Sequence, residues 1–359
     1  MNVSELRKQI DAVDDKIIRH LNRRAKLVLQ IGKLKKDTSD EVYVPSREKK
    51  VLAHVRKVNK GPLSKASIIA IYREIMSGSL ALEQSVRVAY LGPPSTFTHE
   101  AARSRFGGSV LYVACETISD IFSAVKKNQA DYGVVPIENS TEGAVTHTLD
   151  EFVGTELKIC AEIYLQISHH LLVSGPHKNI NRILSNPQVF GQCRNWLRTE
   201  MPGVDLVPVS STARAAEIAA REKGKGTAAI ASALAAEMYR VKIIAADIQD
   251  MSGNMTRFLV IGKAYGRATG DDKSSIMFAV KHQAGSLYRA LGSFKKYGIN
   301  MTKIESRPSR LKAWEYLFFI DIEGHVENPK IRKALRDLEQ HCVLLTILGA
   351  YPRSPEAAE

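Results

Sequence analysis

A threonine and an arginine stand side by side where a buried strand is predicted to begin. Asn254–Arg257 follows a bend at Gly253, and the apolar run Phe258–Ile261 comes next. A glycine bend followed by a short apolar run is typical of a loop that leads into a strand. A hydroxyl beside a guanidinium could hold an anion and give it a proton. A turn-capping threonine beside a surface arginine would show the same pattern.

Cations interrupt the apolar stripe of a long helix that is predicted for residues 4–36. The stripe consists of Leu6, Ile10, Val13, Ile17, Leu21, Val28 and Ile31. At about 100° per residue, Arg24 and Lys35 project into its centre and Arg7 lies at its edge. Buried cations are costly unless they are paired, so these residues indicate a polar site inside a helical assembly. Snorkelling at the end of the stripe could explain Lys35 but hardly Arg24.

Two shorter helices are predicted to complete this region. The first begins at Pro45 and ends before the break at Gly61-Pro62, and it carries Arg47-Glu48. The second runs from about Ser64 to Gln84, with Ser79 inside its apolar face and Glu83 one turn further on. A helix as long as that of residues 4–36 cannot bury its stripe against two partners this short.

The pattern changes after Val86 to short strands alternating with helices. This predicts an α/β region over residues 86–265, which we expect to form two lobes around a cleft. Gly262–Lys273 is rich in glycine and charge and is interpreted as a linker. The order strand, helix, strand, strand, helix, strand follows within 274–352, which is ferredoxin-like α+β structure. The sequence therefore predicts three domains, with the helical one over residues 1–85.

Composition narrows the function. The formal net charge is +13, but no nucleic-acid-binding motif is present, so we interpret the basic residues as solvated helix surface whose field favours small anions. No run of about 18 apolar residues predicts a membrane span, and Met1–Arg7 lacks the apolar core of a signal peptide. The four cysteines form no CxxC pair, which favours reduced thiols in the cytoplasm. His169-His170 lacks a third ligand at suitable spacing, so no metal is expected.

Residues 1 to about 85 resemble the all-helical chorismate mutase domain. The matching residues are Arg7, Arg24, Lys35, Arg47, Glu48, Ser79 and Glu83. The resemblance implies an interlocked dimer in which each site borrows Arg7 from the other chain. Val44 stands where some members have Asp, and Glu83 where some have Gln.

The rearrangement of chorismate to prephenate suits this set of residues. The reaction needs no nucleophile, only a held conformer and stabilised charge. Arginines bind carboxylates bidentately, which makes Arg7, Arg24 and Arg47 the candidates for the two carboxylates. Lys35 and Glu83 are expected to flank the ether oxygen, and Glu48 to accept a hydrogen bond from the ring hydroxyl.

The α/β region resembles prephenate dehydratase through motifs that occur in the order of that family. They are Gly92–Thr98, Pro136–Ser140, Ser185–Gln188, Gln192-Cys193, Ser211–Ala213 and Thr256–Phe258. The resemblance implies a two-lobed fold in which Thr256 donates to the departing hydroxyl of prephenate and Arg257 anchors a carboxylate. It also places Asn139, Ser185 and Gln192 in the cleft as positioning groups.

The C-terminal region resembles the ACT regulatory domain of these enzymes. The resemblance rests on the element order, on Glu305-Ser306-Arg307-Pro308, and on the loop Ala284–Leu287, where many relatives have Gly-Ala-Leu-Val. It implies that Gly285, Leu287, Glu305, Ser306 and Arg307 bind phenylalanine between subunits.

Together these features predict a multidomain enzyme of phenylalanine biosynthesis that converts chorismate to phenylpyruvate and is inhibited by phenylalanine. Neither step is a redox reaction, so no cofactor or metal is expected. A homodimer or higher homo-oligomer is expected, without nucleic acid or membrane as partner. A two-lobed ligand-binding sensor with a regulatory tail is the alternative from a different functional class.

Overall fold

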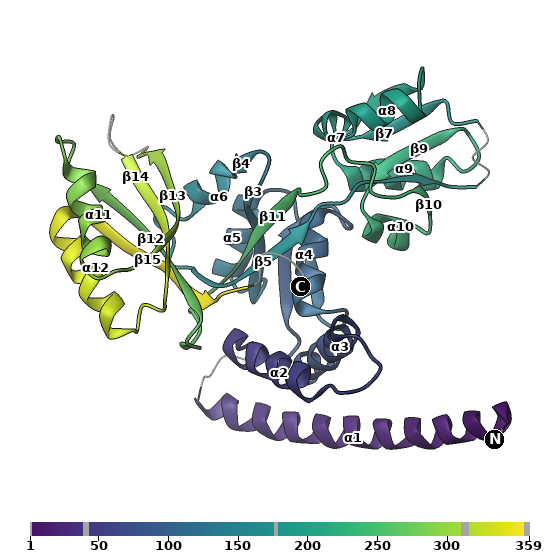
Figure 1. The fold of residues 1–359 in the computed structure, drawn as a ribbon, viewed down its shortest axis with the longest axis horizontal. Helices are drawn as coiled ribbons and strands as arrows, with labels where there is room; N and C mark the ends of the chain where they lie inside the picture. The colour runs from purple at the N-terminus through teal and green to yellow at the C-terminus, as the bar shows by residue number, and fades with distance from the viewer. Residues whose placement is uncertain (1, 39–42, 176–178, 310–315, 355–359) are drawn as a thin grey trace. The chain divides into compact units, whose positions relative to one another are not determined.

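The computed structural model describes residues 2–38, 43–175, 179–309 and 316–354, the side chains of 35–38 excepted. Its contacts divide the chain into two compact units, residues 1–87 with 105–111 and residues 88–104 with 112–359. Helices come first, and strands alternating with helices follow, as the labels in Figure 1 show. The predicted multidomain architecture is confirmed.

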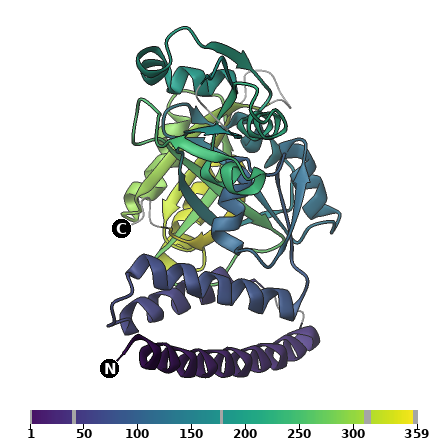
Figure 2. The ribbon, with the colours of Figure 1, turned by 90° about the vertical axis from the view of Figure 1, so that its right-hand side faces the viewer.

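Three helices make up most of the first unit, and the first is much longer than its partners (Figure 2). α1 (Val3–Thr38) has 36 residues, against 14 in α2 (Pro45–Val58) and 19 in α3 (Lys65–Glu83). The Ser64 hydroxyl caps α3 by accepting a hydrogen bond from the Ser67 amide.

The apolar stripe of α1 stays largely exposed within one chain. Leu6, Ile10, Val13 and Ile17 are between 41% and 57% exposed. At 1.5 Å per residue, α1 extends well beyond both of its partners, so they cannot cover the stripe. The expectation that two short helices would leave it uncovered agrees with the structure.

A ten-stranded sheet runs through the second unit in the order β13-β14-β12-β15-β5-β11-β3-β1-β2, with β4 beside β3. The strands of its first lobe are β1 (Arg87–Leu91), β2 (Leu111–Cys115), β3 (Tyr132–Asn139), β4 (Gly143–Ala144), β5 (Lys158–Gln166) and β11 (Met255–Gly262). The helices of this lobe are α4 (Phe97–Phe106), α5 (Ile118–Lys126) and α6 (Thr146–Glu151). The lobe is therefore an α/β layer structure, as predicted.

The second lobe has a sheet of its own in the order β10-β6-β9-β7-β8. Its strands are β6 (His170–Val173), β7 (Arg182–Ser185), β8 (Asp205–Pro208), β9 (Thr227–Ala231) and β10 (Lys242–Ala245). Its helices are α7 (Pro187–Gln192), α8 (Arg194–Glu200), α9 (Thr212–Arg221) and α10 (Ala233–Tyr239). The chain enters this lobe after β5 and returns through β11, so the two lobes are joined by two crossing segments.

The C-terminal region has the predicted βαββαβ order. Its elements are β12 (Asp272–Val280), α11 (Ser286–Lys296), β13 (Met301–Pro308), β14 (Tyr316–Glu323), α12 (Pro329–His341) and β15 (Cys342–Pro352). Phe278, Phe294, Ile320 and Leu338 form a core between the sheet and the helices. The ferredoxin-like fold is confirmed.

The predicted linker at Gly262–Lys273 is shorter in the structure. Gly262 is the last residue of β11, and Asp272 and Lys273 already belong to β12. Lys273 is 2% exposed, and its ammonium group pairs with Glu162 at 3.2 Å, which offsets the cost of burying the charge. Composition could not reveal this, because a charged residue is typical of a linker and the buried partner is distant in sequence.

The C-terminal sheet is continuous with the sheet of the first lobe. β15 pairs with β5 in parallel where Gly349 meets Ile159, and the Lys158 ammonium group donates to the Ile347 carbonyl at 2.8 Å. Leu348 packs in the core of the first lobe, together with Leu259. A Cβ at Gly349 would collide with the backbone of Ile159, lying 2.8 Å from its amide nitrogen. The close approach of the two strands therefore requires glycine.

Gly349→Ala is expected to lower the free energy of unfolding of the second unit by about 1–3 kcal/mol, as overpacking does elsewhere. Urea unfolding followed by circular dichroism measures this. Gly292→Ala in α11 is the control, because a Cβ there meets nothing within 4 Å and alanine favours a helix. Equal stability of Gly349→Ala and wild type would show that the β15–β5 contact does not constrain the fold.

Candidate active sites

A cavity of about 380 Å³ lies within the helical unit, and four arginines from four segments reach it. The charged lining residues are Arg24, Arg47, Glu48, Arg73, Glu83 and Arg105. Cations therefore outnumber carboxylates around the space, and Val28, Ile31 and Leu80 supply apolar wall. A cavity of this size and lining suits a small anion with an apolar body.

The electrostatics of the arginines support an anionic ligand. Burial lowers the pKa of the Arg24 guanidinium, while Tyr72 opposes this effect and Arg47 adds to it. Burial likewise lowers the pKa of Arg73, with Glu48 opposing. A lowered pKa means that the charged form has too little counter-charge nearby. Carboxylates of a ligand would supply that charge with bidentate hydrogen bonds.

Most of the residues predicted for this site line the cavity. They are Arg24, Arg47, Glu48, Ser79 and Glu83. The Arg24 guanidinium donates to Ser79 Oγ, which donates to the Ile75 carbonyl at 2.7 Å. Arg7 is exposed on α1 and does not line the cavity, and the Lys35 side chain lies outside the described residues.

Two of the arginines that line the cavity, Arg73 and Arg105, were not predicted from the sequence. Arg73 lies on the same face of α3 as Met76, Ser77 and Leu80, so helical spacing from those residues could have indicated it. Arg105 donates to Tyr43 Oη at 2.5 Å and pairs with Glu48 at 3.2 Å. Nothing in residues 1–85 could indicate Arg105, because it belongs to α4.

Gly32 makes room for Glu83. Gly32 is buried in α1, and a Cβ there would lie 2.8 Å from Glu83 Cγ, closer than real Cβ contacts. Any side chain at position 32 must therefore turn the Glu83 carboxylate away from its present place in the cavity.

Gly32→Ala is expected to lower chorismate mutase activity by about tenfold or more, because small displacements of a catalytic group are costly. Helix stability should not fall, since alanine is the better helix former. Gly78→Ala in α3 is the matched control, where a Cβ meets only Ser109 Oγ at 3.9 Å. Steady-state loss of chorismate measures both variants. A Gly32→Ala enzyme as active as Gly78→Ala would remove Glu83 from the reaction.

A second cavity, of about 300 Å³, lies in the second unit, with both lobes contributing to its lining. Its polar lining residues include Asn139, Glu142, His169, Gln188, Gln192, Ser211, Asn254 and Thr256. Asn139 is the last residue of β3 and Thr256 is the second residue of β11, and the two are register partners in the sheet. Antiparallel pairing thus brings the two predicted motifs to one point of the cleft.

The Asn139 amide sets the direction of the Thr256 hydroxyl. Asn139 Nδ2 donates to Thr256 Oγ1 at 2.8 Å and to Asn254 Oδ1 at 2.7 Å. Asn139 Oδ1 accepts from the backbone amides of Thr141 and Glu142, which fixes the orientation of the amide. Because Thr256 Oγ1 is the acceptor in this contact, its own hydrogen remains for donation into the cleft.

Gln192 is held by His169 at the other side of the cleft. Gln192 Oε1 lies 2.7 Å from His169 Nε2, and Gln192 Nε2 donates to Glu142 Oε1 at 3.2 Å. An amide oxygen only accepts, so His169 carries its hydrogen on Nε2. Burial lowers the pKa of His169, with the Gln192 hydrogen bond opposing and His170 adding. A neutral His169 therefore positions Gln192 at neutral pH.

The structure does not bring Ser185 and Arg257 to the lining of this cleft. Ser185 is fully buried and donates to the Ile230 carbonyl at 2.9 Å, while its neighbour Asn186 lines the cavity. Arg257 follows Thr256 in β11, and successive side chains of a strand point to opposite faces. Its guanidinium accordingly lies away from the cleft, in a cluster of buried charges.

Asn139→Asp tests the hydrogen-bond direction at Thr256. A carboxylate keeps the shape of the amide but only accepts, so it would take the Thr256 hydrogen away from the cleft. Prephenate dehydratase activity should fall by about a hundredfold or more, the scale of a positioned proton donor. Asn186→Asp adds the same charge to the same cleft away from Thr256 and should cost much less. Comparable losses in both variants would contradict the assignment.

A smaller cavity of about 170 Å³ lies in the C-terminal region, and one of the predicted effector residues, Leu287, lines it. Tyr316 and Phe318 of β14 also line it. Gly285 caps α11 with φ of 77°, a backbone conformation that favours glycine. Glu305, Ser306 and Arg307 do not line this cavity, but they lie on β13, which pairs with β14.

The histidine pair does not form part of a metal site in the described residues. The His170 ring accepts from the Asp247 amide at 3.1 Å, and His169 is bonded to Gln192. Across residues 2–38, 43–175, 179–309 and 316–354, no three His, Cys, Asp or Glu side chains are grouped as metal ligands would be. In the same ranges, no helix is both long and apolar enough to cross a membrane.

Comparison with protein families gives three matches in chain order. The family model of chorismate mutase type II matches residues 6–84, that of prephenate dehydratase matches 88–265, and that of the ACT domain matches 274–340. Each match falls on one of the three regions described above.

Individual relatives match over most of this chain. A bifunctional chorismate mutase/prephenate dehydratase of Aquifex aeolicus is 46% identical over 98% of both chains. One of Pseudomonas aeruginosa is 43% identical over 97% of both chains. The crystal structure of a prephenate dehydratase from Arthrobacter aurescens in complex with L-Phe is similar with a TM-score of 0.69 and 32% identity. That similarity covers 76% of this chain and 92% of the other.

Proposed function

This chain belongs to the family of bifunctional chorismate mutase/prephenate dehydratases, and we propose that each of its two cavities carries one of the reactions. Chorismate becomes prephenate in the helical cavity, and prephenate becomes phenylpyruvate in the cleft between the lobes. The main support is that the chain has two separate cavities, one in the helical unit and one between the lobes, and the lining of each suits one of the two reactions.

In the mutase reaction the protein holds one conformer of chorismate and stabilises charge on the breaking ether bond. Arg24 and Arg47 bind the carboxylates of the substrate as bidentate donors. Glu48 accepts from the ring hydroxyl, and its pairing with Arg105 holds it in place. Lys35 and Glu83 flank the ether oxygen.

In the dehydratase reaction the bond to the ring hydroxyl and the bond to the ring carboxylate both break. The electrons of the carbon–carboxylate bond complete the aromatic ring, and carbon dioxide departs. The hydroxyl takes one proton and departs as water. Thr256 donates to this oxygen, and Asn139 holds Thr256 in the orientation that donation requires. Gln192 positions the substrate from the second lobe.

The exposed stripe of α1 is the surface for a second copy of this chain. Ile10, Val13 and Ile17 are about half exposed, and a partner helix of equal length is the element able to cover them. The second copy also supplies Arg7, which does not reach the cavity within one chain. A homodimer or a larger homo-oligomer is therefore part of the proposal.

Phenylalanine is the proposed effector, and the C-terminal region is its site. The similar structure from Arthrobacter aurescens is a complex with L-Phe. The cavity lined by Leu287, Tyr316 and Phe318 offers apolar surface for an aromatic side chain. Of the other predicted effector residues, Gly285 precedes Ser286 of the lining, and Glu305, Ser306 and Arg307 lie on β13, which pairs with β14. The free cysteines suit a reducing compartment, so we place the enzyme in the cytoplasm.

Chorismate supplied to the purified protein tests the proposal. We expect chorismate to disappear and phenylpyruvate to form without added cofactor. In Thr256→Ala, prephenate should accumulate, because dehydratase activity falls by about a hundredfold or more while mutase activity stays near wild type. A chain that binds both compounds but converts neither would be the ligand-binding sensor instead. Unchanged dehydratase activity in Thr256→Ala would refute the role of Thr256.

A further inference from the structure

The strand pair that carries the dehydratase residues has a second, charged face. Asn139 pairs with Thr256, and the preceding residue of β3, Glu138, pairs with Arg257 of β11. Because side chains alternate along strands, one couple faces the cleft and the other faces the C-terminal sheet. The register breaks between Arg257 and Phe258, a bulge that redirects side chains next to the site.

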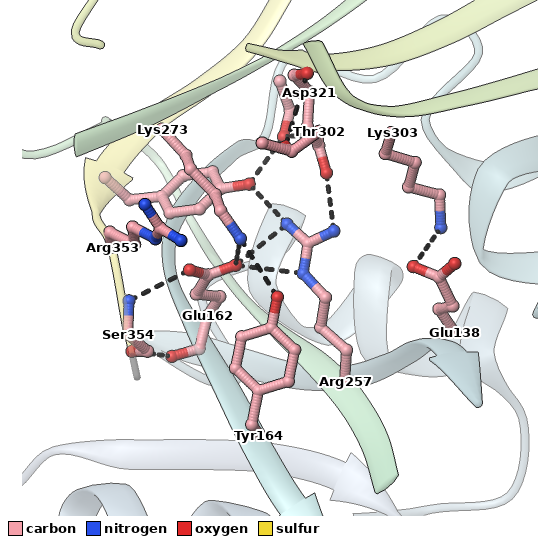
Figure 3. Close-up of polar contacts among 12 residues, drawn as sticks. Glu138, Glu162, Tyr164, Arg257, Lys273, Thr302, Lys303, Asp321, Arg353 and Ser354 are labelled. Carbon is pink, nitrogen blue, oxygen red and sulfur yellow. Dashed lines mark hydrogen bonds and ion pairs between the residues drawn. The ribbon is translucent and has the colours of Figure 1, made fainter. Parts of the chain in front are cut away.

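The Arg257 guanidinium is bound on several sides, as Figure 3 shows. It donates to Glu162 Oε2 from Nε at 3.0 Å, and its Nη2 forms an ion pair with the same oxygen at 2.9 Å. Its Nη1 donates to Asp321 of β14 at 2.5 Å. Its Nη2 donates to Tyr351 Oη of β15 at 2.9 Å. Arg257 thus ties β11 to two strands of the C-terminal sheet.

The charges of this cluster are buried and balanced. Arg257 and Lys273 are 6% and 2% exposed, and they face the buried carboxylates of Glu162 and Asp321. Burial alone would lower the pKa of Arg257, but Tyr351, Asp321 and Glu162 outweigh it and raise that pKa. Burial would raise the pKa of Asp321, but Arg257 and Ser275 outweigh it and lower that pKa. Arg257 and Asp321 therefore stay charged and paired at neutral pH.

A second ion pair lies beside the first and joins the strands next to β11 and β14. Lys303 of β13 pairs with Glu138 of β3 at 2.8 Å (Figure 3). Lys303 and Asp321 are themselves register partners on β13 and β14. A cation and an anion that are neighbours in the C-terminal sheet, Lys303 and Asp321, thus pair with an anion and a cation that are neighbours in the dehydratase sheet, Glu138 and Arg257. We call these four residues the charge clamp.

The clamp lies on the strands that border the proposed effector site. β13 continues from Lys303 into Glu305–Arg307, and β14 continues from Asp321 back to Phe318, which lines the effector cavity. Arg307 adds a third pair across the same boundary, to Asp150 of α6 at 3.2 Å.

We propose that the charge clamp is the coupling device of the enzyme: Glu138 and Arg257 are positioning residues through which β13 and β14 set the orientation of Asn139 and Thr256. The inference rests on the proposed function, because it connects the proposed effector site to the proposed dehydratase site. When phenylalanine binds and shifts β13 and β14, Lys303 and Asp321 move with these strands. Glu138 and Arg257 follow because they are paired with them. The next residues along β3 and β11, Asn139 and Thr256, form the hydrogen bond that orients the Thr256 hydroxyl.

The physical basis is the cost of separating buried charges. If β14 moved without β11, Asp321 would separate from Arg257 and leave an unpaired charge in a dry interior, which is strongly unfavourable. The paired strands are therefore expected to move together. If the boundary has two arrangements and phenylalanine binds one of them more tightly, phenylalanine shifts the active site toward that arrangement, which is what inhibition requires.

Lys303→Met and Glu138→Gln test the clamp at its more solvent-accessible pair, where Glu138 is 41% exposed. Each variant should still bind phenylalanine in calorimetry, but dehydratase inhibition should require about tenfold more phenylalanine or be lost. The double variant should be no less sensitive than the single variants, because both remove one interaction. Circular dichroism of every variant reports whether it is folded.

Lys296→Met is the matched control, because Lys296 pairs with Asp337 at 2.6 Å in the same region but away from the boundary. It should keep wild-type inhibition. Wild-type inhibition in Lys303→Met, or additive effects in the double variant, would overturn the clamp while leaving the effector proposal intact. A wild-type enzyme that phenylalanine does not inhibit would instead overturn the effector proposal itself. If Lys303→Met does not fold, Glu138→Gln alone decides between these outcomes.

Discussion

A guanidinium buried with its counter-charges organises the second unit of this enzyme. Arg257 lies where the dehydratase sheet meets the C-terminal sheet, and its partners come from β5, β14 and β15. Removing any one partner would leave a charge in a dry environment, so the strands are held in one arrangement. The close passage of Gly349 past Ile159 completes that boundary with backbone hydrogen bonds. Catalytic and regulatory regions therefore share one sheet and one charge cluster.

The arginines of the helical cavity and the arginine of the buried charge cluster, Arg257, have different roles because their surroundings differ. In the helical cavity, burial lowers the pKa of Arg24 and of Arg73, since few carboxylates compensate for it. At Arg257 the surrounding carboxylates outweigh burial and raise the pKa. A cation short of counter-charge attracts an anionic substrate, whereas a cation already paired holds structure. An anionic substrate would supply the counter-charge that the arginines of the helical cavity lack.

The dehydratase cleft relies on hydrogen-bond direction rather than on charge. Asn139 is fixed by two backbone amides and by Asn254, so it can only donate to Thr256. A threonine hydroxyl is a weak acid, and its usefulness depends on where its hydrogen points. The neutral His169 serves the same purpose for Gln192 across the cleft. Such a site is sensitive to small strand movements, which suits an enzyme controlled from a neighbouring sheet.

The sequence alone determined which elements form and which motifs could do chemistry. Helical periodicity located α1, and the cations in its stripe pointed to a polar site, because a buried charge must have a function or a partner. The order of strands and helices predicted the ferredoxin-like region, and the resemblance of their motifs to prephenate dehydratase placed Asn139 and Thr256 in the cleft. These features are local, so they can be inferred without knowing what lies opposite each residue.

Only the tertiary structure decided what each charged residue faces. Arg257 stands beside Thr256 in the chain, yet the pleat sends it to the opposite face, where Asp321 binds it. Lys273 lies in a stretch whose composition predicts a linker, yet it is buried and paired with Glu162. Arg105 lines the mutase cavity although it lies outside the predicted helical domain. Partners distant in sequence fix these roles, since the free energy of a charge depends on its three-dimensional surroundings. Residue type and spacing do not encode those surroundings.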